Sequence, residues 1–201
     1  MLWYTRNMKK VYFILHLVDE CKNSSKNLPK HIIEHCNKLY TDKKLTASIF
    51  AYCNLELLLN KFNKSLNDLS FSDNGKPVLK NGYVSISHCD EWVLLSYSEE
   101  NHGVDLEKLK IIENINKLVS RYFPKLKEKH NFDLLDEKTR NELFYSWWTR
   151  KEAYVKLIDG NVLSYNELEM LDSSIKYQTY VDGNIVISFC LKDEFVVEKV
   201  Y

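Results

Sequence analysis

Two carboxylates stand two residues apart in the short segment 103–107, Gly-Val-Asp-Leu-Glu. Because side chains alternate between the two faces of a strand, Asp105 and Glu107 would point the same way, with aliphatic neighbours pointing into the core. Such a pair suits a hard cation such as Mg²⁺, which takes one or two carboxylates together with phosphate oxygens and water. Taken alone, an Asp-x-Glu pattern is common on the solvated face of an edge strand, and that interpretation is then favoured.

A second segment, 148–156, adds a third carboxylate and basic residues at helical spacing. Glu152 and Lys156 are four residues apart and share one helix face with Trp148. On an arbitrary helix they would form an exposed ion pair, but the two adjacent tryptophans before the Arg-Lys-Glu run are not typical of a solvent-facing surface. Joined to segment 103–107, this helix would complete a site for a divalent cation and a phosphate-rich ligand, which indicates phosphoryl-group chemistry.

The hydrophobic pattern predicts the elements that must position these residues. Asp136 is a plausible N-cap of the helix that carries Glu152, and Gly160 a plausible stop. Pro124 breaks the helix before it, and the composition of residues 73–77 predicts a turn. The predicted strands are 10–17, 83–88, 92–97, 103–107, 175–181, 185–191 and 195–201, and the predicted helices are 42–62, 112–122 and 136–158.

Each half of the chain therefore has a strand, a long helix and further strands, although no residue-level repeat relates the halves. With 201 residues, one domain and two fused halves are both plausible. The order of elements indicates an α+β protein with a duplicated architecture.

The composition is that of an ordinary globular protein, with 45% hydrophobic and 28% charged residues and a formal net charge of zero. Zero net charge gives no general attraction to nucleic acid or to anionic membranes. The apolar run 11–15 is too short to span a bilayer and no small-residue cleavage site follows it. Five scattered cysteines without a Cys-x-x-Cys pair favour reduced thiols and a cytoplasmic location.

Four motifs in order carry a resemblance to a known family. They are Gly75-Lys76-Pro77, Ser85-Ile86-Ser87-His88, the strand 103–107 and the helix 148–156. In this order and at this spacing the chain resembles the 4′-phosphopantetheinyl transferases of the type that activates surfactin synthetase. Each motif is weak or moderate alone, and the combination over residues 75–156 is highly specific.

The resemblance implies transfer of the phosphopantetheine arm of coenzyme A to a serine of an apo acyl or peptidyl carrier protein, with Mg²⁺ as cofactor (Mn²⁺ as the alternative) and 3′,5′-ADP released. It implies two similar α+β halves in a pseudo-twofold arrangement with the active site between them. Residues 1–103 would form the nucleotide side of the coenzyme A site, and residues 104–201 the side that binds metal and carrier. A monomer that binds neither nucleic acid nor membrane is expected.

By position in the motifs, the resemblance also assigns individual residues. The metal ligands would be Asp105, Glu107 and Glu152, and the catalytic residues Glu152 and Lys156, with Glu152 as ligand, base or both. The residues implied to bind coenzyme A are Lys43, Lys44, Lys76, Pro77, Ser87, His88, Lys151 and Lys156.

The chain departs from the family pattern at several positions. Lys127 occupies the place of a usual glutamate, and Glu128 follows it. The basic residue that meets the 3′-phosphate maps to Lys43 or Lys44 without a clear choice. A further arginine is absent, with Tyr52 or Cys53 in its place.

The segment 108–130 carries seven Lys or Arg residues against two acids, although the whole chain is neutral. Because carrier proteins are typically acidic around their serine, this segment, with Ile111, Leu118 and Phe123, is a candidate docking surface. An ordinary solvated helix is an equally weighted interpretation.

Other classes of function were weighed against the transferase. Metal-dependent nucleases also combine acids and lysines around Mg²⁺, but the neutral charge and the lack of a basic–aromatic stripe argue against them. A non-catalytic homologue that only binds carriers is the nearer alternative, although all three carboxylates are retained. His31 and His35 have helical spacing, but no further zinc ligands stand at a recognisable distance in the sequence.

Overall fold

The computed structural model describes residues 8–18, 28–39, 42–161 and 172–200. The chain divides into two compact units, here called unit 1 (residues 1–101 with 195–201) and unit 2 (residues 102–194). The last strand of the chain thus belongs to unit 1, whereas the sequence grouped it with the second half.

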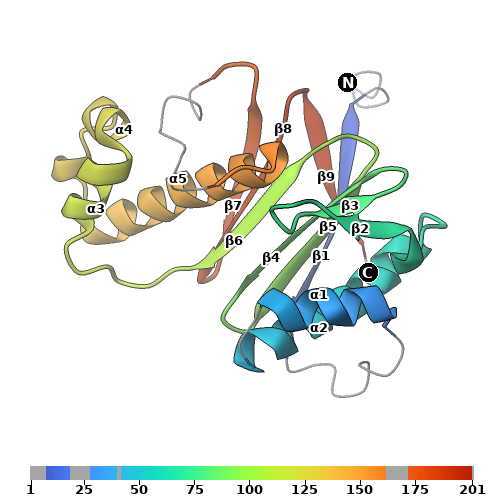
Figure 1. Cartoon of the computed structure of the whole chain (residues 1–201). Helices are drawn as coiled ribbons and strands as arrows, with labels where there is room; N and C mark the ends of the chain where they lie inside the picture. Colours follow the sequence, from blue (N-terminus) through green and yellow to red (C-terminus); the bar gives the residue numbers. More distant parts are fainter. Residues whose placement is uncertain (1–7, 19–27, 40–41, 162–171, 201) are drawn as a thin grey trace. The chain divides into compact units, whose positions relative to one another are not determined.

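Unit 1 is built on a sheet with the strand order β4-β5-β1-β9 (Figure 1). Its strands are β1 (Lys9–Leu17), β4 (Tyr83–Cys89), β5 (Trp92–Ser98) and β9 (Phe195–Lys199). The first three pair antiparallel, and β9 runs parallel to β1 at the sheet edge. All four confirm strands expected from the apolar pattern.

Two helices, α1 (Lys30–Leu39) and α2 (Asp42–Asn60), complete the core of unit 1. Helix α2 packs against β5, and α1 packs against α2. The core between them is aliphatic and aromatic, with Leu55, Leu58 and Leu59 fully buried. The helix expected over 42–62 is confirmed. Helix α1 and the short hairpin of β2 (Leu69–Phe71) and β3 (Pro77–Leu79), which follows the 3-10 turn Leu66–Asp68, were not predicted.

Unit 2 has an antiparallel sheet with the order β6-β8-β7. Its strands are β6 (Gly103–Lys108), β7 (Lys176–Asp182) and β8 (Ile185–Leu191), and every residue of the central strand β8 is buried. Gly183 forms the β7–β8 turn with φ +58°, a conformation that glycine adopts without steric cost. The three strands lie where the sequence predicted them.

The long helix α5 (Glu137–Ile158) lies along the sheet of unit 2 (Figure 1) and packs against β6 and β8. Asp136 is its N-cap, as predicted, and its carboxylate accepts the Thr139 N–H at 3.0 Å. At the other end Asp159 adopts the left-handed conformation, and the Gly160 N–H bonds to the Val155 carbonyl at 2.9 Å. This left-handed closure ends α5 at the predicted place.

Two short helices, α3 (Ile115–Tyr122) and α4 (Pro124–Lys129), and the 3-10 turn Phe132–Leu134 precede α5. Pro124 stands at the first turn of α4, where its missing N–H costs nothing. It therefore starts a helix as well as ending one, and α3 begins three residues later than predicted.

Both units mix helices and strands, so the predicted α+β class is confirmed. The pseudo-twofold relation of the halves stays a prediction. In the described part of the chain, no helix combines the length and the hydropathy needed to cross a membrane.

Candidate functional site

The central feature of unit 2 is the close approach of α5 to β6. A Cβ atom placed on Gly103 would lie 1.8 Å from the Ala153 carbonyl oxygen and 2.7 Å from the Leu157 nitrogen. No side chain fits there, so the glycine lets the helix backbone rest directly on the strand. Asp105 and Glu107 lie on the same face of β6 as this contact, because alternate residues of a strand share a face. The approach at Gly103 therefore places α5 over the face that carries both carboxylates.

Asp105 is consequently buried beneath α5, with 5% of its side chain exposed. Its Oδ1 accepts a charged hydrogen bond from Lys156 Nζ at 2.7 Å. The Lys156 side chain is 28% exposed, so its ammonium group lies at the rim of the contact. The solvated-strand interpretation of Asp105 is therefore wrong, and the predicted meeting of the strand and the helix is observed.

Glu152 lies within electrostatic reach of this pair. Its pKa is raised to about 7, first by burial and then by the Asp105 carboxylate. Lys156 opposes the shift, Glu107 adds to it, and Lys151 opposes it. A carboxyl with this pKa exchanges its proton near neutral pH, as a general base must.

The three predicted metal ligands thus repel one another, which is the electrostatic situation that a divalent cation relieves. In the described ranges, no three or more His, Cys, Asp or Glu side chains are grouped closely enough to hold a metal ion, so Asp105, Glu107 and Glu152 do not converge within metal-bridging reach as the metal-site prediction requires. Because Lys156 Nζ holds Asp105 Oδ1, the ammonium group and a cation would share this carboxylate.

Lys151 lies on another side of α5 and is only 3% exposed. Its Nζ is 5.2 Å from the centroid of the Tyr122 ring and 6.0 Å from those of Phe123 and Trp148. These cation–π contacts stabilise a buried ammonium group. To contact a phosphate, as the motif implies, Lys151 would have to move out from between these rings.

Unit 1 positions the residues assigned to the nucleotide. Gly75 has φ +83°, and the Lys76 N–H bonds to Ser72 Oγ at 3.0 Å, which closes the predicted turn before Pro77. Lys76 Nζ donates to Asn101 Oδ1 at 3.3 Å. The turn and this hydrogen bond therefore hold Lys76 beside Asn101, the last residue of the first segment of unit 1.

Ser87 and His88 lie at the end of β4, paired with Leu94 and Val93 of β5. Ser87 is 5% exposed and His88 is half-buried. Lys43 and Lys44 fall in the first turn of α2, and their side chains lie outside the described residues.

The candidate docking segment 108–130 is only partly a surface. Ile111 is 78% exposed, and Leu118 packs at the edge of the core. Phe123 is fully buried among Phe144, Trp147 and their neighbours. The expectation that Phe123 contributes to docking is therefore wrong, because it supports α3 and α4 from inside.

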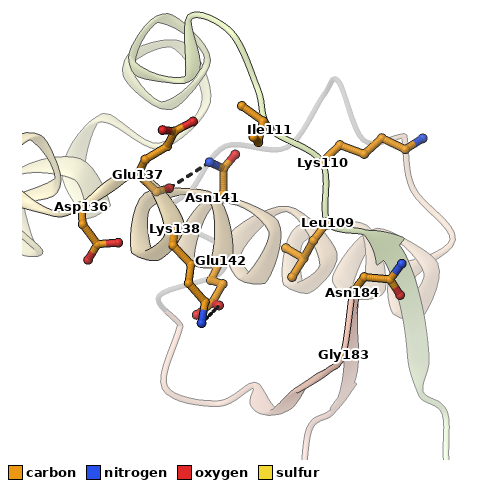
Figure 2. A pocket seen from close by; sticks show the side chains of 10 residues that line it. All are labelled: Leu109, Lys110, Ile111, Asp136, Glu137, Lys138, Asn141, Glu142, Gly183 and Asn184. Atoms are coloured by element: carbon orange, nitrogen blue, oxygen red, sulfur yellow. Dashed lines mark hydrogen bonds and ion pairs between the residues drawn. The ribbon is translucent and has the colours of Figure 1, made fainter.

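A cavity of about 640 Å³ lies at the start of α5, and Figure 2 shows the side chains that line it. Asn141, one of its lining residues, accepts the Ile112 N–H at 3.2 Å and donates to the Glu137 carbonyl at 2.9 Å. None of the predicted site residues lines this cavity, so it is separate from the Asp105–Lys156 contact. Its lining consists of Leu109, Lys110, Ile111, Asp136, Glu137, Lys138, Asn141, Glu142, Gly183 and Asn184.

One group of buried polar residues was missed by the sequence analysis. Ser188 is the single polar residue of strand β8, and it is fully buried beside Thr149 of α5. The signal was present, because a lone hydroxyl in an apolar strand needs a hydrogen-bond partner.

Comparison with known proteins gives a family match. Residues 101–196 match the model of the 4′-phosphopantetheinyl transferase superfamily. The chain is similar to the 4′-phosphopantetheinyl transferase Sfp of Bacillus subtilis (strain 168), with 26% identity over 162 residues, covering 77% of this chain and 67% of that protein.

Two further relatives align over shorter stretches. The 4′-phosphopantetheinyl transferase ffp of Bacillus subtilis is 34% identical over 104 residues, covering 48% of this chain and 43% of that protein. The 4′-phosphopantetheinyl transferase gsp of Aneurinibacillus migulanus is 31% identical over 114 residues, covering 51% of this chain and 46% of that protein. These two alignments span less than half the length of either relative.

Proposed function

Because residues 101–196 match the model of the 4′-phosphopantetheinyl transferase superfamily, we propose that the chain is such a transferase and modifies a carrier protein. The serine hydroxyl of an apo acyl or peptidyl carrier attacks the pyrophosphate of coenzyme A. A new phosphorus–oxygen bond to the serine forms, the bond to the nucleotide breaks, and 3′,5′-ADP leaves. The observation that carries the proposal is the meeting of Asp105, Glu152 and Lys156 inside the matched segment.

Asp105, Glu107 and Glu152 are proposed to hold Mg²⁺, with Mn²⁺ as the alternative. The fit rests on their donor type and on their mutual repulsion, which raises the pKa of Glu152. When bound, the cation supplies neutralising charge to the pyrophosphate. The residues that hold it are all on β6 and α5, so unit 2 alone would provide the metal site.

Glu152 is proposed to take the serine proton, directly or through a water. Its pKa of about 7 leaves a useful fraction ionised near neutral pH. Lys156 donates to Asp105 in the structure, and the remaining N–H donors of its ammonium group would meet the phosphates in the reaction. Phosphoryl transfer needs such positioning and charge neutralisation more than covalent help.

The nucleotide part of coenzyme A is assigned to unit 1. Lys76, Pro77, Ser87 and His88 would contact it, with Lys43 or Lys44 at the 3′-phosphate and Lys151 of unit 2 at the pyrophosphate. The active site would then lie between two halves in a pseudo-twofold arrangement, with residues 1–103 on the nucleotide side and 104–201 on the metal and carrier side.

The carrier is proposed to dock on the basic segment 108–130. Lys125 and Arg121 are exposed there, and Ile111 borders the cavity of Figure 2. Positive rim charge steers an acidic partner and acts mainly on the encounter. The protein is proposed to act as a cytoplasmic monomer.

The test is incubation of the protein with coenzyme A, Mg²⁺ and a panel of apo carrier proteins. The expected result is a mass gain of one phosphopantetheine on at least one carrier, with an equal amount of 3′,5′-ADP. Intact coenzyme A with every carrier, together with carrier binding alone, would favour the non-catalytic homologue. Cleavage of nucleic acid under the same conditions would favour the nuclease.

A further inference from the structure

A row of three polar side chains crosses the sheet of unit 2 beneath α5. Asp105 of β6 pairs with Ser188 of β8, and Ser188 pairs with Thr179 of β7. Directly paired residues place their side chains on the same face of a sheet, so all three face the helix. Asp105 is 4% exposed and Ser188 is fully buried.

Each member of the row is bonded to a residue of α5. Lys156 Nζ meets Asp105 Oδ1 at 2.7 Å. Thr149 Oγ1 meets Ser188 Oγ at 2.7 Å. Arg150 Nε donates to Thr179 Oγ1 at 2.8 Å, and the Thr179 and Ser188 hydroxyls are 2.9 Å apart.

Either oxygen could be the donor in each of the two hydroxyl–hydroxyl contacts, and one assignment of the protons satisfies every group. In this assignment Thr149 donates to the Tyr145 carbonyl at 2.9 Å and accepts from Ser188. Ser188 then accepts from Thr179, which in turn accepts from Arg150. The chain therefore runs from the Arg150 guanidinium through three hydroxyls to a helix carbonyl, and each hydroxyl donates once and accepts once. Such chains are mutually polarised and geometrically demanding.

The surroundings of the row show why this geometry matters. On one side Cys190 packs with Ala153 and Leu157, and on the other Val186 packs with the aromatic cluster of Trp147. Apolar packing of this kind tolerates small shifts and substitutions. The hydroxyl chain does not tolerate such shifts, because a rotation of α5 would break its short hydrogen bonds.

Glu152 lies between the two anchored positions of the helix. Thr149 and Arg150 come three and two residues before it, and Lys156 comes four residues after it. At about 1.5 Å per residue, the anchored stretch from Thr149 to Lys156 is about 10 Å long. A helix pinned at both ends of so short a stretch presents its intervening side chain at a fixed rotation.

We propose that Ser188, through the hydroxyl chain Arg150–Thr179–Ser188–Thr149, is a positioning residue that sets the rotation of α5 and so orients Glu152 toward Asp105 and Glu107. The expected effect on kcat rests on the proposed transferase function. The expected effect on the affinity for a divalent cation can be measured without any turnover.

The test compares Ser188→Ala with Ser96→Ala, a matched control. Ser96 is also a fully buried serine in a sheet, and its hydroxyl donates to the Ser85 carbonyl in unit 1 at 3.1 Å. Mn²⁺ affinity is measured by calorimetry, transfer by the carrier mass assay, and folding by the thermal midpoint. Thr149→Ser keeps the hydroxyl of the chain, and Thr149→Val removes it.

Ser188→Ala and Thr149→Val are expected to weaken Mn²⁺ binding by about tenfold and to lower kcat by about the same factor, as loss of partners that orient metal ligands commonly does. KM for the carrier should not change. Ser96→Ala and Thr149→Ser should leave affinity and kcat at wild-type values. If Ser188→Ala does not fold, Thr179→Val interrupts the same chain on the half-buried strand β7.

A lower thermal midpoint in Ser188→Ala with wild-type Mn²⁺ affinity and kcat would overturn the proposal, since the chain would then be structural only. If Mn²⁺ affinity falls as expected but the wild-type protein transfers nothing to any carrier, the positioning role stands and the proposed function fails.

Discussion

The two helix–sheet contacts of the molecule are built in opposite ways. In unit 1, α2 rests on its sheet through an aliphatic and aromatic core that includes Leu55, Leu58 and Leu59. In unit 2, α5 rests on its sheet through a central polar row that includes Asp105 and Ser188. The buried carboxylate Asp105 and the buried ammonium of Lys151 both belong to unit 2.

Burying charge costs free energy that an apolar contact would not. We infer that α2 is packed for stability, whereas α5 is packed to hold ionisable groups at fixed places. Changes in the two contacts should therefore separate stability from activity.

The largest effect is expected at Gly103. Gly103→Ala should lower the free energy of unfolding by about 4 kcal/mol or more, because the new Cβ would lie 1.8 Å from the Ala153 carbonyl and push α5 off β6. Urea denaturation measures the loss. Gly183→Ala is the control, since its Cβ would meet nothing within 4 Å and only the strain of φ +58° remains. Wild-type stability in Gly103→Ala would show that α5 does not rest on the strand.

The apolar contact is tested by Leu58→Ala. Removing this fully buried side chain should cost about 2–5 kcal/mol of unfolding free energy. Transfer per folded molecule should not change, because the residue supports no ionisable group. Denaturation and the carrier mass assay are run on the same sample. A large loss of kcat in fully folded Leu58→Ala would show that the contact of α2 with its sheet does not serve stability alone.

The polar contact is tested by Asp105→Ala. It should slow transfer on the order of 10²-fold or more, since it removes a charged ligand of the proposed metal site. The fold should survive, because the partner Lys156 is 28% exposed and can reach water. Asp133→Ala is the control, because Asp133 also forms an ion pair, with Lys127, but its own side chain is exposed. Near-normal turnover of Asp105→Ala at limiting Mg²⁺ would exclude the metal role.

The two contacts should also differ in their response to pH. In the folded protein burial raises the pKa of Glu152 from its ordinary value of 4.5 to about 7, so the folded state binds this proton more tightly than the unfolded state does. EDTA keeps metal ions away from the site. Under these conditions Glu152 makes its full contribution to the free energy of unfolding below about pH 4.5, and this contribution is lost as the pH rises toward 7. Glu152→Gln should remove that slope. An unchanged slope in Glu152→Gln would show that another group titrates.

The smallest effect is expected at the surface. Lys125→Glu should raise KM for the carrier a few-fold and leave KM for coenzyme A unchanged, because exposed charges act on encounter. Steady-state kinetics at two salt concentrations measure it. Lys30→Glu, at an exposed position on α1, is the control. Equal effects of the two variants would mean that segment 108–130 is an ordinary solvated surface.

Much of the fold could be predicted from the sequence, since the strands and long helices follow regular apolar patterns. Helix α1 follows the polar stretch 21–30 and was missed although Ile32 and Cys36 have helical spacing. Pro124 breaks one helix, but it also fits the first turn of the next. The hairpin of β2 and β3 is too short for its pattern to be recognised.

The site could be predicted only in part. Motif spacing brought Asp105, Glu152 and Lys156 to one place, because alternation on a strand and the helical repeat are local rules. The burial of Lys151 among rings and the Ser188 hydroxyl chain depend on the register of three strands and on the rotation of α5. Neither quantity is encoded in local spacing.

The proposed metal site on β6 and α5 can be tested by metal binding in the presence of coenzyme A. Electron paramagnetic resonance of Mn²⁺ reports free and bound metal in solution, so the wild-type protein is compared with the triple variant Asp105→Asn, Glu107→Gln and Glu152→Gln. We expect one Mn²⁺ bound per wild-type molecule and none per triple variant, with both proteins folded. Equal Mn²⁺ binding by the two proteins would contradict the claim that the polar contact of β6 and α5 is the metal site.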